Sequence, residues 1–177
     1  LLYSDQGLYV KAEPLFLRTL AIHEKVLGPE HLYTASPLSN LALLYANQGL
    51  YAKAEPLYIR ALEIREETLD PEHSDVAIIL NNLAFLYKHQ GLYAKAEPLY
   101  KRSIGIREKV LGPEHPSTAI PLSNLGLLYA DQGLYAKAEP LYTRALAIEE
   151  KSLGPEHPST AITLNNLGGL YSDQELY

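Results

Sequence analysis

The segment Gln-Gly-Leu-Tyr-Ala-Lys-Ala-Glu-Pro-Leu-Tyr occurs three times without change, at residues 48–58, 90–100 and 132–142. Each copy begins 42 residues after the previous one, and a fourth, slightly altered copy lies at residues 6–16. A period of roughly 20–50 residues is typical of a solenoid, because one repeat cannot bury its apolar face alone and must stack on its neighbours. The segment therefore predicts an array of stacked repeats.

The 177 residues carry a net charge of -6 and include no cysteine, methionine or tryptophan. The lack of cysteine excludes disulfides and thiolate metal sites. Nucleic-acid binders need a basic surface to displace counterions, so the charge argues against such a partner. No apolar run approaches the roughly 20 residues of a membrane span. We expect a cytoplasmic protein with no membrane partner. The missing initiator methionine and the start inside a repeat predict that the sequence belongs to a longer protein.

Residues 74–116 show how one repeat is built. Apolar residues first recur at spacings of three and four, as in an amphipathic helix, at Ala77, Leu80, Leu83, Ala84 and Tyr87. Gly91 breaks this pattern, and a second one follows at Tyr93, Ala96, Leu99, Tyr100, Ile104, Val110 and Leu111. Gly112 and Pro113 end the second pattern. Each repeat is predicted to contain a short helix A, a tight turn, a longer helix B and a four-residue loop.

Pro98 lies inside the second helical pattern, as do Pro14, Pro56 and Pro140 in the other copies. Proline is least costly in the first turn of a helix, where backbone amides have no intrahelical partner. We therefore expect helix B to begin near Leu92 or Tyr93. For the same reason, Pro37 and Pro121 predict that helix A begins close before each of them.

The pattern resembles the tetratricopeptide repeat (TPR). The small and aromatic positions of that family are matched by Leu80, Leu83, Ala84, Tyr87, Gly91, Tyr93, Ala96, Tyr100 and Ser103. The family's usual repeat has 34 residues, and the extra residues here follow Ser103, which predicts a longer helix B. The sequences at residues 80–84, 96–102 and 111–116 are similar to the kinesin-light-chain type. The resemblance implies an all-α, right-handed superhelix of antiparallel helix pairs. It also implies a concave groove, lined by the A helices, that holds peptides or protein partners.

The resemblance covers the whole chain, so we expect residues 1–177 to form a single repeat array. Its repeats are predicted at residues 32–73, 74–115 and 116–157, with partial repeats at about 1–31 and 158–177.

We find no pattern that predicts catalysis or a cofactor. His31, His73, His115 and His157 each follow Glu in the loop between repeats. Copies one repeat apart should be separated by roughly 20 Å, the width of two helices, so they cannot share one metal ion. We expect them to structure the loop or cap a helix. Glu13, Glu55, Glu97 and Glu139 also recur once per repeat. We expect a solvated face alongside Arg18, Arg60, Arg102 and Arg144, not a paired-carboxylate site. The chain is thus predicted not to be an enzyme.

Thirteen of the 14 tyrosines fall at three repeat positions, and only Tyr33 lies outside them. Aromatic side chains could form a stacking platform for bases. The tyrosines follow helical spacing and lack interleaved basic residues, so we assign them to the core.

Asparagine repeats in phase at Asn40, Asn82, Asn124 and Asn166. In the family that the chain resembles, this position faces the groove and hydrogen-bonds a peptide backbone. An amide offers both donors and an acceptor for that purpose. The alternative is that Asn ties neighbouring A helices together. The expected groove residues are Ser39, Asn40, Leu43, Asn81, Asn82, Phe85, Lys88, Ser123, Asn124, Leu127, Asn165 and Asn166.

Nearly all charged residues lie on the B helices and in loops. We therefore expect an almost neutral groove that binds a neutral, extended segment of a protein or peptide partner, in preference to an acidic one.

The last helix A keeps an apolar series formed by Leu164, Leu167, Leu170 and Tyr171. Terminal repeats usually carry a polar capping face. The apolar face predicts an alternative function, in which copies of the chain stack head to tail as a homo-oligomer. Glu175 replaces the turn glycine of the other repeats, and we expect the helix to run on through it.

Overall fold

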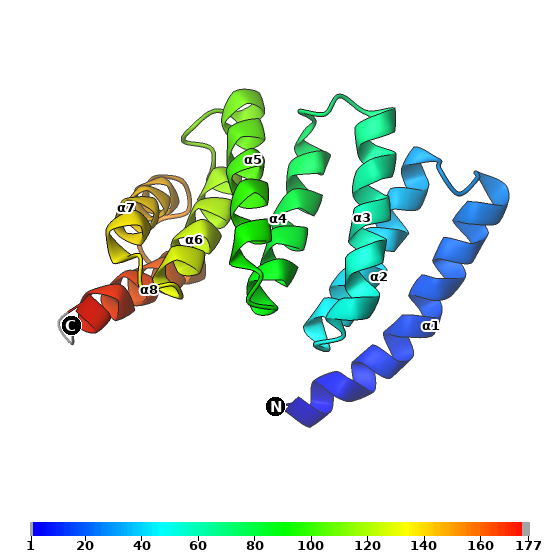
Figure 1. The fold of residues 1–177 in the computed structure, drawn as a ribbon, viewed down its shortest axis with the longest axis horizontal. Coiled ribbons are helices and arrows are strands. Elements are labelled where there is room, and N and C mark those ends of the chain that lie inside the picture. Colours follow the sequence, from blue (N-terminus) through cyan, green and yellow to red (C-terminus); the bar gives the residue numbers. More distant parts are fainter. Residues whose placement is uncertain (1, 175–177) are drawn as a thin grey trace. The chain divides into compact units, whose positions relative to one another are not determined.

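The computed structural model describes residues 2–174, with the side chains of residues 8–174 (Figure 1). This part of the chain is helical with connecting turns and loops, and it contains no strand. The chain divides into two compact units, Leu1–Gln90 (unit 1) and Gly91–Tyr177 (unit 2). The division falls inside the predicted repeat at residues 74–115.

In unit 1, one helical hairpin carries a helix on each side. The hairpin is formed by α2 and α3, while α1 packs on α2 and α4 packs on α3. The A helices α2 and α4 also contact each other. The elements are α1 (Leu2–Val26), η1 (Leu32–Thr34), α2 (Ala35–Asn47), α3 (Tyr51–Thr68) and α4 (Ser74–His89).

Unit 2 repeats the arrangement with α6 and α7 as its hairpin. Here α5 packs on α6, α8 packs on α7, and the A helices α6 and α8 also meet. The elements are α5 (Tyr93–Leu111), α6 (Pro116–Ala130), α7 (Tyr135–Ser152) and α8 (Pro158–Gln174).

The B helices α3, α5 and α7 begin where the prolines predict, at Tyr51, Tyr93 and Tyr135. The prediction is wrong for α1, which begins at Leu2 and has Pro14 as its thirteenth residue. The B helices are also the longer helices, since α7 has 18 residues and α6 has 15. Pro98 is the sixth residue of α5, however, so it lies one turn deeper than the first turn. Pro121 is likewise the sixth residue of α6, whereas Pro37 lies in the first turn of α2.

The turn between helices A and B depends on glycine. Gly49 and Gly133 have φ of 74° and 70°, the left-handed region that other residues rarely adopt. The next residue, Leu50 or Leu134, then donates its N–H back to the carbonyl of Tyr45 or Tyr129 at 2.9 Å, which closes the helix end. The expected effect of Glu175 at this position lies outside the described residues.

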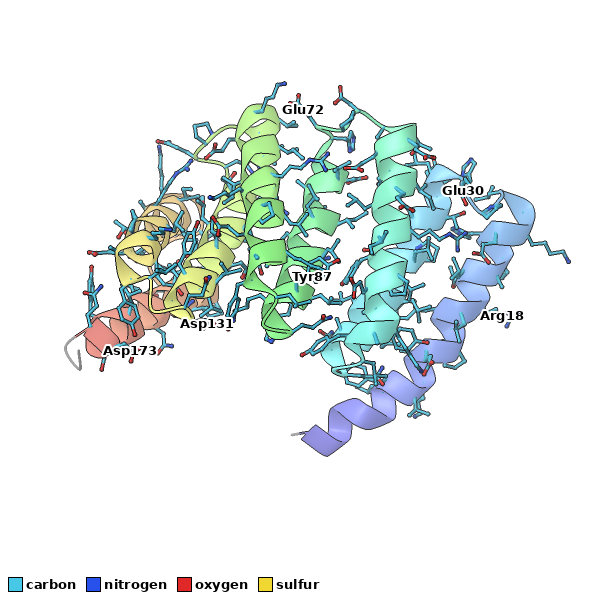
Figure 2. All side chains as sticks on the ribbon, in the orientation of Figure 1. Arg18, Glu30, Glu72, Tyr87, Asp131 and Asp173 are labelled. Atoms are coloured by element: carbon cyan, nitrogen blue, oxygen red, sulfur yellow. The ribbon has the colours of Figure 1, made fainter. Side chains whose placement is uncertain are left out.

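Tyrosine fills the core at two of its three repeat positions. Tyr58, Tyr100 and Tyr142 on the B helices are fully buried, and Tyr45, Tyr87 and Tyr129 on the A helices are buried as well. The third position, at the start of helix B, is only half-buried at Tyr9, Tyr51, Tyr93 and Tyr135. Figure 2 shows the side chains that fill the space between helices within each unit. The core assignment is thus confirmed for the tyrosines of α2 to α7 at the first two positions. It is wrong for Tyr171 on α8, which is 44% exposed, and it holds in part for the third position.

Candidate functional site

In unit 1 the A helices α2 and α4 enclose a pocket of about 160 Å³. The predicted groove residues Ser39 and Asn40 line it from α2, while Ile78 and Ile79 line it from α4. Asn40 is exposed and Ser39 is half-buried. The structure therefore brings two predicted residues to a concave site between neighbouring A helices.

The pocket contains a charged pair that the sequence analysis missed. Arg65, from α3, donates from Nη1 to the carboxylate of Asp75 on α4, and its Nη2 donates to Ser36 Oγ on α2 at 2.9 Å. A charged side chain of helix B therefore reaches the pocket in unit 1. The pocket still carries no formal net charge, because Arg65 and Asp75 neutralise each other.

The asparagines of α4 occupy different environments. Asn81 is only 8% exposed, and its Nδ2 donates to Asn82 Oδ1 at 3.4 Å. The prediction of Asn81 as a contact for a bound peptide is therefore wrong, because packing covers its side chain. Asn82 is half-buried and stays accessible on the same helix.

Phe85 and Lys88 lie further along α4. Phe85 is 38% exposed, and its ring packs edge-on against that of His89 with 4.2 Å between centroids. Lys88 is half-buried in the last turn. On α2, Leu43 is exposed. An open apolar surface therefore continues along the two helices from the pocket.

The predicted groove residues of unit 2 lie on α6 and α8. Ser123, Asn124 and Leu127 are half-buried on α6, whereas Asn165 is exposed and Asn166 half-buried on α8. Ser123 Oγ lies 3.2 Å from Thr163 Oγ1. A polar side chain of this face therefore ties two A helices together at the position before Asn124.

Glu149 of α7 is another functional candidate that the sequence analysis missed. The side chain is 4% exposed, and its Oε2 has no hydrogen-bond partner among the described residues. Burial raises the pKa of the carboxyl group, although a hydrogen bond with Thr163 and the nearby His157 oppose the shift. A carboxyl group is therefore held beside the Ser123–Thr163 contact at the junction of α7 and α8.

The recurring glutamates of helix B do not form a solvated face. In each case the hydroxyl of a tyrosine 32 residues later donates to the Glu Oε1. The bonds are Tyr45 to Glu13 at 2.7 Å, Tyr87 to Glu55 at 2.9 Å, Tyr129 to Glu97 at 2.8 Å and Tyr171 to Glu139 at 2.9 Å. That prediction was wrong, because each carboxylate joins a B helix to the next A helix.

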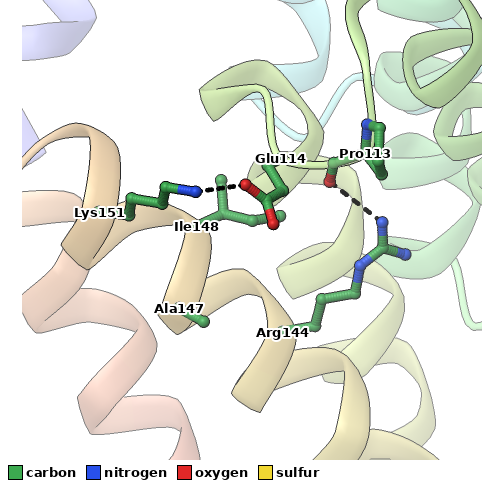
Figure 3. Close-up of a pocket in the computed structure, with 6 residues that line it drawn as sticks. All are labelled: Pro113, Glu114, Arg144, Ala147, Ile148 and Lys151. Atoms are coloured by element: carbon green, nitrogen blue, oxygen red, sulfur yellow. Dashed lines mark hydrogen bonds and ion pairs between the residues drawn. The ribbon is translucent and has the colours of Figure 1, made fainter.

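Arg60 and Arg144, which were also placed on a solvated face, act in the loops between repeats. Arg60 Nη2 donates to the carbonyl of Pro29 at 2.9 Å, and Arg144 Nη2 donates to that of Pro113 at 3.1 Å. Around Arg144 this arrangement forms an open pocket of about 300 Å³. Figure 3 shows that a Lys151–Glu114 ion pair of 2.5 Å crosses it. Both basic side chains of this pocket are thus paired with the loop, so the pocket serves to hold the loop against α7.

The loop histidines act as helix caps, as expected. Nδ1 of His31, His73, His115 and His157 accepts the backbone N–H two residues later at 3.1–3.2 Å. No group of three or more potential metal ligands lies close enough together to hold an ion within the described residues. None of the described helices has the length and apolarity of a membrane span.

The predicted self-association residues on α8 differ in exposure. Leu164 and Tyr171 are 46% and 44% exposed, and Leu167 is half-buried. Leu170 is only 2% exposed. The prediction that Leu170 belongs to an open face is therefore wrong, because the side chain lies in the core of unit 2.

Comparison with known proteins identifies the class. A family model described as tetratricopeptide repeat matches four overlapping stretches, residues 1–67, 33–107, 75–150 and 119–177. The chain belongs to the tetratricopeptide repeat family. Repeats of this family generally form non-catalytic scaffolds for protein interaction, and this chain is such a scaffold.

Solved structures place the chain among kinesin-light-chain-like repeats. BtubC (BKLC) from P. vanneervenii is 30% identical with a TM-score of 0.83, covering 96% of this chain and 67% of that one. Two structures of a putative kinesin light chain from Podosopora anserina with nearly identical TPR-like repeats are 28% identical. Their TM-scores are 0.81 and 0.79, covering 98% of this chain and 82% of theirs. No curated protein matches the sequence. The predicted family, repeat type and all-α superhelix fold class are confirmed.

Proposed function

We propose that the chain is a cytoplasmic scaffold that binds an extended, largely neutral peptide segment along its A helices. The observation that carries the proposal is the pocket between α2 and α4, where the exposed amide of Asn40 adjoins the Arg65–Asp75 pair. Amide groups can donate to and accept from a peptide backbone of any sequence. The self-neutralised ion pair offers no surplus charge for an acidic or basic segment.

Neighbouring groups explain why an extended segment fits best. The accessible amides of Asn40 and Asn82 lie on two successive A helices, next to the exposed apolar side chains of Leu43 and Phe85. A strand-like peptide presents backbone groups along its length and side chains on alternating sides. It can therefore use the amides and the apolar surface together.

The test is a binding assay of the full chain against three peptide pools of matched length, one neutral, one acidic and one basic. We expect the neutral pool to bind best. A neutral peptide from that pool should bind Asn40→Ala and Asn82→Ala with a dissociation constant raised roughly 2- to 10-fold, the value of one hydrogen bond. Gln48→Ala is the matched control, because it removes an amide at the end of α2, outside the pocket.

Stronger binding of the acidic or basic pool would contradict the neutral-segment proposal. A dissociation constant that is unchanged in both asparagine variants would move the binding surface away from the α2–α4 pocket.

Self-association is a second candidate function. It is favoured by a different observation, the exposure of Leu164 and Tyr171 on α8. Large exposed apolar patches mark interaction surfaces. This surface lies in unit 2 on the last A helix, so it is separate from the peptide pocket of unit 1.

A further inference from the structure

The pocket between α2 and α4 holds hydrogen-bond donors and an acceptor next to each other. Arg65 donates from Nη1 to Oδ2 of Asp75, and from Nη2 to Ser36 Oγ at 2.9 Å. Each of these two nitrogens carries a second N–H group. Among the described residues, Oδ1 of Asp75 accepts no hydrogen bond. The ion pair therefore leaves donors on Arg65 and an acceptor on Asp75 that a ligand can use.

Both charged side chains line the pocket together with an apolar wall. The side chain of Asp75 is 38% exposed and that of Arg65 is 14% exposed. Ile78 and Ile79 of α4 supply the apolar wall, and Ile78 is 47% exposed. The pocket measures about 160 Å³, which is the space of roughly five water molecules at about 30 Å³ each. It therefore has room for one side chain of medium length.

We propose that the pocket between α2 and α4 anchors the bound segment by a glutamine side chain. The inference rests on the peptide-binding function proposed above and names the residue that the pocket selects. The side-chain carbonyl of the glutamine accepts from Arg65, and its NH₂ group donates to Oδ1 of Asp75. The methylene groups of the same side chain lie against Ile78.

Other side chains match the two charged groups less well. A carboxylate meets the negative charge of Asp75 and an ammonium group meets the positive charge of Arg65, so each gains one attraction and suffers one repulsion. An apolar side chain displaces water from both groups without replacing its hydrogen bonds. A primary amide is neutral, and its acceptor and donors lie on different atoms. It can therefore satisfy both groups at once.

The equivalent positions of α7 and α8 in unit 2 lack this ion pair. Glu149 stands where unit 1 has Arg65, and Ser159 stands where it has Asp75. Ser123 Oγ and Thr163 Oγ1 lie 3.2 Å apart, so two side chains meet at positions that line the open pocket in unit 1. The preference for glutamine therefore belongs to unit 1 and sets the register of the bound segment along the chain.

The test compares the binding of four peptide pools to the full chain. The peptides have equal length and blocked ends, and their flanking positions are random mixtures of alanine, serine, threonine and leucine. The central residue is glutamine, glutamate, lysine or methionine. We expect the glutamine pool to bind best in fluorescence anisotropy, with a dissociation constant about tenfold below that of each other pool. Methionine is close to glutamine in length but has no amide, so it isolates the two hydrogen bonds.

Asp75→Asn should change which pool binds best. The substitution keeps the shape of the side chain but leaves Arg65 as an uncompensated cation in the pocket. The dissociation constant of the glutamate pool should therefore fall about tenfold or more, and glutamate should replace glutamine as the preferred residue. Asp70→Asn is the matched control, because it makes the same change of charge at an exposed loop residue outside the pocket. It should keep the preference of the parent chain.

The outcomes separate the glutamine anchor from peptide binding itself. Equal binding of the pools to the parent chain, or tightest binding of any pool other than glutamine, would overturn the anchor and leave peptide binding standing. A preference for glutamine that persists in a folded Asp75→Asn variant would also overturn it, because the selecting site would then lie elsewhere. If none of these pools binds, the anchor is overturned, and if the neutral pool described above fails as well, so is the proposed function.

Discussion

Units 1 and 2 are built from nearly the same repeat, yet they differ at the position from which helix B reaches toward the A helices. In unit 1, Arg65 of α3 pairs with Asp75 and bonds Ser36. In unit 2, Glu149 of α7 takes the place of Arg65, and Ser159 takes that of Asp75. Glu149 is buried with one oxygen that lacks a hydrogen-bond partner among the described residues. The repeat thus keeps its backbone and core constant while the charge at its inner surface varies.

Arg107 of α5 shows an intermediate case within unit 2. It retains the arginine, but Ser117 occupies the position of Asp75, and Nη1 donates to the Ser117 carbonyl. Burial lowers the pKa of its guanidinium group, as expected for a cation removed from water. Three copies of one position therefore hold a cation paired with a carboxylate, a cation that donates to a backbone carbonyl, and an anion.

Among substitutions at these positions, Arg65→Leu should change the free energy of unfolding the most. The substitution leaves Asp75 without its cation and removes the bond to Ser36, so the free energy of unfolding should fall by about 2 kcal/mol. That is below the usual range for a broken buried pair, because Asp75 is partly exposed. Urea unfolding followed by circular dichroism measures it. Arg18→Leu, at an exposed arginine of α1, should change stability by less than about 0.5 kcal/mol. Equal losses in both variants would refute a special role for Arg65.

Glu149→Gln should raise the free energy of unfolding, whereas Arg65→Leu lowers it. Burial raises the pKa of Glu149 above the ordinary value of 4.5, so the folded chain binds more protons than the unfolded chain between those two pKa values. The free energy of unfolding therefore falls as pH rises through that window, and the penalty is fully present above the raised pKa. The neutral amide of glutamine avoids the cost of burying a charged carboxylate. We expect the free energy of unfolding to rise by about 1 kcal/mol at pH 7.

The pH profile provides the check on Glu149→Gln. The gain should shrink as the pH falls to 4.5, because the parent carboxyl group then becomes neutral as well. A gain that is the same at pH 4.5 and pH 7 would mean that burial of charge is not its cause.

The smallest change in the free energy of unfolding is expected from removing a tyrosine hydroxyl, and it should be the same in both units. Tyr87→Phe in unit 1 and Tyr129→Phe in unit 2 each remove one hydroxyl bond to a helix B glutamate. Each substitution should lower the free energy of unfolding, measured with urea, by roughly 0.5–1 kcal/mol. Tyr58→Phe is the control, because its buried hydroxyl has no hydrogen-bond partner among the described residues, and it should be close to neutral. A loss in Tyr58→Phe as large as in the other two would point to an unseen partner of that hydroxyl.

Much of the fold follows from the sequence, because its causes are local and repeat. Tyr93 and Pro98 indicate where α5 begins, and the turn glycines mark the end of each helix A. The Tyr–Glu bonds were missed because their partners lie 32 residues apart in different helices, and a glutamate beside an arginine fits a solvated face equally well. Their constant offset in four copies is the signal that could have revealed them.

The groove was harder to predict than the helices. The position of Arg65 and Glu149 is not constant in the repeat, and the two side chains enter from helix B, not from the helices that line the groove. The change from arginine at residues 65 and 107 to Glu149 is the signal that could have drawn attention to this position. Leu170 was misassigned because apolar spacing identifies the faces of a helix that are buried but not which neighbour covers each face.

The Tyr–Glu bonds have a consequence for how such a chain can change in length. Every junction between repeats uses the same two side chains at the same offset, so a complete 42-residue repeat can be added or removed without leaving either partner unmatched. An insertion of another length inside the helices between a glutamate and its tyrosine would rotate one of the two side chains away from the other. The reach of the scaffold can therefore vary in steps of one repeat by duplication or loss of the corresponding DNA, while every remaining junction stays as it was.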